Sequence, residues 1–182
     1  VVLSGFAVHL GASDEMAGYI PLISSISGIF LVFSGLFLER FKNIKKLVIC
    51  LNSIAKPLLV SIILVPLLIP EKLKVLVLFI ILIIGYSINM LMSLAINSWF
   101  VNVIPLNIRG RYFAIRQVFA VIISALVPLI SGIILDITGK RYTGFAILYG
   151  TALVFIILEN IAFWNVEDSY IENIDREKLN IA

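Results

Sequence analysis

The chain has 182 residues, of which 61% are hydrophobic and 14% are charged. A soluble domain is about 45–50% apolar and about 25% charged, so this composition excludes an ordinary water-soluble protein. The formal charge of +3 is small and dispersed, which argues against a nucleic-acid-binding face. With one cysteine and one histidine, the chain has no disulfide framework of its own, and a zinc site is not expected.

Long apolar runs, separated by short polar stretches, set the expected architecture. A membrane-spanning helix needs about 20 apolar residues, because it rises about 1.5 Å per residue through a core about 30 Å thick. Runs of this length cover residues 18–38, 47–69, 73–100, 113–135 and 142–164, and residues 1–10 are typical of the end of an earlier span. We therefore predict an all-α transmembrane helix bundle of about six spans, the first truncated, over residues 1–164. Residues 165–182 would begin a cytoplasmic linker.

The basic residues give the expected orientation of this bundle. Short connections make neighbouring helices antiparallel, so successive loops alternate between the two sides of the membrane. Loops 39–46 and 105–112 and the residues next to them carry more Lys and Arg than the loops on the other side. Because short loops rich in these cations stay in the cytoplasm, we predict that loops 39–46 and 105–112 are cytoplasmic.

The segment SGLFLERFKNIKKLV contains the most specific motif of the chain. A glycine near the end of an apolar run is followed four positions later by an acid and then by cations: Gly35, Glu39, Arg40, Lys45 and Lys46. This pattern resembles the G-x-L-x-D-R-x-G-R-R loop signature of the major facilitator superfamily. Glu39 replaces the usual Asp, a Lys replaces the second Gly, and the basic pair is displaced.

A second loop extends this resemblance. Pro105, Arg109, Gly110 and Arg111 are similar to the Pro and Arg-Gly that many facilitator-type transporters carry between their fourth and fifth spans. The resemblance covers the whole chain as the N-terminal six-helix half of that fold, and the surroundings of both loops fit bacterial members.

The resemblance implies a secondary transporter of small solutes in the cell membrane, working by alternating access and without a cofactor. Its partners would be the lipid bilayer, a small-molecule substrate with or without a coupling ion, and the C-terminal half of the same transporter. The two loop motifs would form a latch at the cytoplasmic gate. The alternative is that these residues are topology signals only.

The fourth apolar run carries polar side chains at helical spacing. Tyr86, Asn89, Ser93 and Asn97 fall within an arc of roughly 80°, at about 100° per residue. An amide against lipid would lack a hydrogen-bonding partner, so this stripe is expected to face protein or a water-filled cavity. The facilitator resemblance implies that it contacts substrate, and interhelical hydrogen bonding is the alternative.

Two ionisable residues, Lys56 and Glu159, fall inside predicted spans. Charge inside a membrane is costly, so each is a candidate functional residue. In the facilitator fold, however, these two helices stand away from the substrate cavity. Snorkelling toward the cytoplasm or mutual pairing is therefore favoured.

Small residues recur every fourth position in the fifth run, at Ala120, Ser124, Pro128 and Gly132, and predict close helix packing. No paired acids, metal ligands or activated nucleophile are visible in the sequence, so no catalytic or metal-binding residue is predicted. A polytopic membrane enzyme and a non-transporting scaffold or sensor are the alternative functions.

Overall fold

A computed structural model describes residues 2–29, 38, 40, 41, 43–139 and 141–166. All secondary structure within these residues is helical. The elements in chain order are α1 (Val2–His9), α2 (Asp14–Ser27), α4 (Ile44–Val60), the 3₁₀ turn η1 (Ser61–Leu64), α5 (Val65–Leu68), α6 (Glu71–Val103), α7 (Leu106–Ile137) and α8 (Tyr142–Asn165).

Four helical stretches of the described residues are long and apolar enough to cross a membrane. They are Ile44–Leu68, which joins α4, η1 and α5, followed by α6, α7 and α8. The chain is thus an all-helical membrane protein, and these stretches coincide with the last four predicted runs. α1 has 8 residues and α2 has 14, too few to span a bilayer by themselves. The predicted run 18–38 extends past α2 into residues 30–37, which lie outside the described part, so six spans stay a prediction.

Polar residues and prolines at the helix boundaries explain where the helices begin. The Met16 N–H donates to Ser13 Oγ at 3.3 Å, and the Lys46 N–H donates to Asn43 Oδ1 at 3.0 Å. Both are N-terminal caps, which satisfy backbone donors that lack a partner in the first turn. Pro70 and Pro105 immediately precede α6 and α7. These signals are local, which is why sequence patterns located the long helices.

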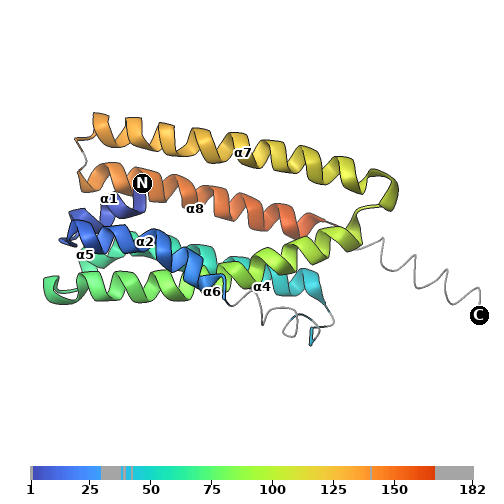
Figure 1. Cartoon of the computed structure of the whole chain (residues 1–182), viewed down its shortest axis with the longest axis horizontal. Helices are drawn as coiled ribbons and strands as arrows, with labels where there is room; N and C mark the ends of the chain where they lie inside the picture. The colour runs from blue at the N-terminus through green and yellow to red at the C-terminus, as the bar shows by residue number, and fades with distance from the viewer. Residues whose placement is uncertain (1, 30–37, 39, 42, 140, 167–182) are drawn as a thin grey trace, which may run out of the picture.

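The long helices run side by side, with their connections alternating between two ends of the bundle (Figure 1). The α4–α6 pair has the most extensive contact of any two helices. Gly85 of α6 allows part of this approach, since a Cβ at that position would lie 2.5 Å from Leu59 Cδ2 of α4. Close helix contact at a small residue is the usual packing mode in membranes.

Two separate groups of buried apolar side chains hold the bundle together. One contains Phe6, Leu78 and Phe145 and lies near the α1–α2 and α7–α8 connections. The other contains Val48 and Trp99 and lies near the start of α4 and the end of α8. The middle of the bundle, between these two groups, is where the polar side chains described below meet.

Against the described residues, the small-residue stripe of α7 does not make the close packing that the sequence predicts. Ala120, Ser124 and Pro128 are exposed, and a Cβ at Gly132 would meet nothing within 4 Å. The Ser124 hydroxyl donates to the Val121 carbonyl of its own helix. Helical phase correctly gathers these residues on one face, but it does not specify which face of α7 meets the rest of the described chain.

Candidate functional site

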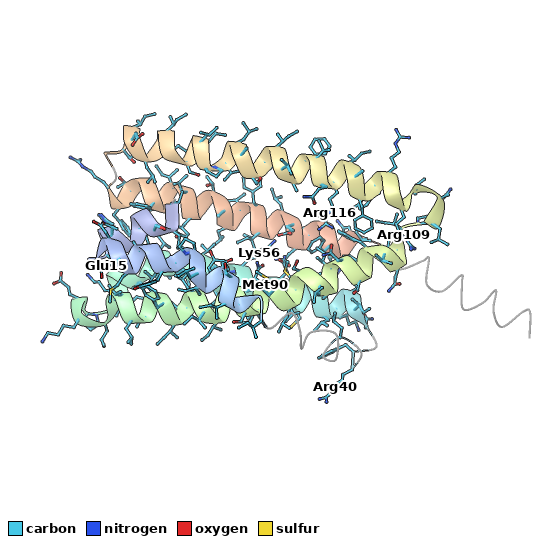
Figure 2. The ribbon with its side chains drawn as sticks, in the orientation of Figure 1. Glu15, Arg40, Lys56, Met90, Arg109 and Arg116 are labelled. Carbon is cyan, nitrogen blue, oxygen red and sulfur yellow. The ribbon has the colours of Figure 1, made fainter. Side chains whose placement is uncertain are left out.

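An ion pair joins α4 to α8 inside the membrane-length part of both helices. The Lys56 ammonium contacts the Glu159 carboxylate at Oε2. Their side chains are 25% and 32% exposed, and Lys56 lies near the middle of the bundle in Figure 2. The structure thus shows mutual pairing, one of the two alternatives that the sequence left open. Neither charge is left to face hydrocarbon without a counter-ion.

Three uncharged side chains extend this pair into a connected network. Asn52 Nδ2 lies 3.2 Å from Asn160 Oδ1 and 3.5 Å from Glu159 Oε2. The Ser53 hydroxyl donates to Asn160 Oδ1 at 3.1 Å, and Asn160 Nδ2 donates to the Ile156 carbonyl at 3.0 Å. We call Asn52, Ser53, Lys56, Glu159 and Asn160 the α4–α8 polar cluster.

Helical spacing explains why these particular residues meet. Asn52 and Lys56 are four residues apart, so they lie on the same face of α4, with Ser53 beside them. Glu159 and Asn160 are adjacent in α8, and both reach α4. Lys45, near the start of α4, binds the backbone carbonyl of Val166 just past the end of α8. The two helices are therefore tied both at one end and in the middle.

One atom of the cluster has no hydrogen-bonding partner within the part of the chain that the structure describes. Asn52 is 0% exposed, and its Oδ1 is buried without a donor among the described residues. Leaving a buried acceptor unpaired costs about 1–3 kcal/mol.

Residues of α1, α4, η1, α6, α7 and α8 line a cavity of about 470 Å³, which is separate from the cluster. Its lining is mostly apolar. The exceptions are the hydroxyl-bearing residues Tyr86, Ser131, Tyr149 and Thr151. A largely apolar pocket with a few polar groups is typical of small-molecule sites.

The four residues of the predicted polar stripe of α6 have different surroundings in the structure. Tyr86 lines the cavity, whereas Asn97 accepts a hydrogen bond from Arg116 Nη1 of α7 at 3.0 Å. Arg116 also lies over the Phe100 ring, 5.0 Å from its centroid. Asn89 is half-buried and Ser93 exposed, and neither lines this cavity. Of the four candidates, the structure therefore places one in the cavity and one in an interhelical bond.

The residues of the two loop motifs do not form one cluster in the described part. Gly35 and Glu39 lie outside the described residues. Arg40 and Arg109 are well separated at the same end of the bundle in Figure 2. The Arg109 guanidinium donates twice to the Ile104 carbonyl, at 3.1 and 3.3 Å, and so closes the C-terminal end of α6.

The remaining residues of the two loop motifs that the structure describes lie at or next to the ends of α4 and α7. Lys45 is the cation that binds the Val166 carbonyl. Lys46, Gly110 and Arg111 are exposed. Within the described part, these residues act at helix ends, and the latch itself stays a prediction.

Sequence reasoning missed Asn52, Ser53 and Asn160, although a signal for them was present. Each interrupts an apolar run close to an ionisable residue, in CLNSIAK and in ILENIA. Polar residues beside a membrane charge are its natural hydrogen-bonding partners. The missed cavity residues Ser131, Tyr149 and Thr151 gave a weaker signal, because isolated hydroxyls are common in apolar helices.

Among the described residues, no three His, Cys, Asp or Glu side chains come together as a group that could hold a metal ion. Comparison of the chain with protein-family models, curated proteins and solved structures found no match.

Proposed function

We propose that this chain forms the N-terminal half of a facilitator-type secondary transporter, which moves a small solute across a bacterial cell membrane by alternating access. The observation that carries the proposal is the cavity of about 470 Å³ between the helices, whose apolar lining carries a few hydroxyl groups, as is typical of small-molecule sites. The lysine and glutamate of the α4–α8 polar cluster are costly to insert into a membrane, but they pair with each other and do not line this cavity. The two loop motifs support the same family.

The cavity supplies a place for the solute. Its volume is within the range of small-molecule sites, and Tyr86 is the one substrate candidate from the sequence that lines it. The lipid bilayer, the small-molecule substrate and the C-terminal half of the transporter are the proposed partners. Loops 39–46 and 105–112 would face the cytoplasm and form the gate.

Alternating access can be tested at the cavity without knowing the solute. Cys50 is the single cysteine of these 182 residues, so replacing it by Ser, together with any cysteine elsewhere in the whole protein, leaves only the thiols that are introduced. In membrane vesicles of the whole natural protein, Ser131→Cys should react with a membrane-impermeant thiol reagent from each side. Val154→Cys, an exposed α8 position that does not line the cavity, is the matched control and should react from neither side.

The outcome separates a transporter from the alternatives. A Ser131→Cys thiol that is unreactive from both sides would contradict alternating access at this cavity. The complete reading frame gives a second test, since six further apolar spans are expected after residue 182. A soluble catalytic domain there would favour a membrane enzyme.

A further inference from the structure

We propose that the cavity binds an uncharged, mostly apolar solute with an aromatic ring, and that it rejects charged and sugar-like solutes. This inference rests on the proposed function, because it names the class of solute that the same cavity would carry. The side chains that line the cavity, and their depth in the helices, point to this class.

No charged side chain lies among the described residues that line the cavity. The lining consists of aliphatic and aromatic side chains and four hydroxyl groups, which are neutral at neutral pH. Lys56 and Glu159 are not part of the lining, and they contact each other. A charged solute would therefore lose its hydration without gaining a counter-ion, which makes its binding strongly unfavourable.

The hydroxyl groups of the lining are too few for a sugar-like solute. They belong to Tyr86 of α6, Ser131 of α7, and Tyr149 and Thr151 of α8. The Thr151 hydroxyl donates to the Leu148 carbonyl of its own helix at 2.8 Å, so toward a solute it can only accept. A sugar buried here would leave several of its own hydroxyls without a partner, whereas a solute with one polar group can be satisfied.

Three aromatic rings of the lining favour a ring-bearing solute over an aliphatic chain. Tyr86, Tyr149 and Phe155 line the cavity from α6 and α8. The fully buried Phe6 of α1 packs against Tyr149, with 5.6 Å between the ring centroids. Aromatic rings attract each other in offset or edge-to-face arrangements, beyond the effect of buried area. An aromatic solute therefore gains contacts that an alkyl chain does not.

The cavity also lies deep in the apolar part of the bundle. Its α8 residues, from Leu148 to Phe155, are in the middle of a 24-residue helix, and Leu82 and Tyr86 are near the middle of the 33-residue α6. Both helices are long enough to cross a membrane. A bound solute would thus lie at the depth of the bilayer core, where an uncharged and apolar molecule is favoured.

Binding of matched probes to the whole natural protein in phosphatidylcholine vesicles tests the exclusion of charge. Naphthylethanol, naphthylacetate and naphthylethylammonium share one ring system and are neutral, anionic and cationic at neutral pH. Saturable binding of naphthylethanol should be at least about a hundredfold tighter than that of either ion, because neither ion finds a counter-ion in the cavity. Binding of either ion as tight as that of naphthylethanol overturns the proposal.

Two uncharged probes test the remaining parts of the solute class. Decanol, an aliphatic alcohol, should bind about threefold to tenfold more weakly than naphthylethanol, because it lacks the ring. Glucose should show no saturable binding, because the cavity has too few hydroxyls to pair with it. Equal binding of decanol would identify a site for lipid tails, and saturable binding of glucose a site for polar solutes. Either result overturns the proposal.

Two variants place the binding in the cavity. Ala152 lines the cavity, so Ala152→Phe fills part of it, whereas Ala162→Phe adds the same ring to an exposed α8 position outside the lining. Naphthylethanol should bind about tenfold or more weakly to Ala152→Phe, because the added ring competes for its space, and normally to Ala162→Phe. Equal binding to the two variants would place the probe elsewhere and overturn the proposal.

Thiol protection gives the same information without a bulky substitution. At about ten times its Kd, naphthylethanol should slow the labelling of Ser131→Cys about tenfold, and naphthylacetate at the same concentration should not. If naphthylacetate protects a Ser131→Cys thiol that is labelled from both sides of the membrane, the solute class is overturned and the transporter is kept. Conversely, Ala152-dependent binding of naphthylethanol without labelling from both sides supports the solute class and contradicts alternating access.

Discussion

Lys56 and Glu159 are each acceptable inside the bundle because the other is there. A charge transferred out of water loses several kcal/mol of solvation, and a partner in contact returns part of that loss. The two amides and Ser53 add hydrogen bonds but no charge, so the network stays neutral overall. Removing one charged member is therefore a different perturbation from removing both.

We predict that Lys56→Met or Glu159→Gln alone lowers the free energy of unfolding by about 1–3 kcal/mol, between the values for exposed and buried pairs. The double variant should lose less than the sum of the two, because no unpaired charge remains. Thermal unfolding in detergent measures this. The Glu71–Lys74 pair, 4.0 Å apart with Glu71 93% exposed, is the matched control and should show no measurable coupling. Additive losses at Lys56 and Glu159 would mean that the pair is not coupled energetically.

α4 and α7 differ in how closely they pack against the rest of the described chain. α4 is held by α6 through close contact at Gly85 and by α8 through the polar cluster. α7 exposes every residue from 117 to 130, and so exposes all its faces over this stretch. The described part of the chain thus contains one tightly packed helix group, around α4, and one loosely attached long helix.

This difference predicts the effect of enlarging a glycine. Gly85→Leu places side-chain atoms where Leu59 already lies, and overpacking of this kind costs about 1–3 kcal/mol. Gly132→Leu adds the same atoms to α7, where nothing lies within 4 Å. In the isolated 182-residue chain we expect Gly85→Leu to lower the thermal unfolding temperature and Gly132→Leu to leave it nearly unchanged. Equal effects of the two substitutions would contradict the packing described for α4 and α6.

The sequence was sufficient to predict where the long helices lie, but not which of their faces pack together. Apolar length and local signals such as Pro70 and Asn43 act within one segment, so they can be read from one segment. The contact between Asn52 and Asn160 joins residues 108 positions apart, and it depends on how α4 and α8 are rotated about their axes. Periodicity gives the phase within each helix and not the rotation of one helix relative to another. For the same reason the sequence did not predict that two residues of the α6 stripe have different partners: Tyr86 lines the cavity, and Asn97 accepts a hydrogen bond from Arg116.

The long helices begin and end alternately at the two ends of the bundle. At one end of the bundle α4 and α7 begin and α6 and α8 end (Figure 1). At the other end α5 and α7 end and α6 and α8 begin. This alternation is what antiparallel spans require. It relates the loops to each other, while the assignment of either end to the cytoplasm rests on the Lys and Arg count.

Site-directed labelling tests both parts of this topology. In the Cys50→Ser background, Asn43→Cys and Asn107→Cys lie at one end of the bundle and Thr143→Cys at the other, all at exposed positions. Because the cation-rich loops are held in the cytoplasm, an impermeant thiol reagent added outside intact cells should label only Thr143→Cys. Inverted membrane vesicles should label only Asn43→Cys and Asn107→Cys. The reverse pattern would invert the orientation and leave the bundle intact, whereas labelling of all three from one side would contradict the antiparallel arrangement itself.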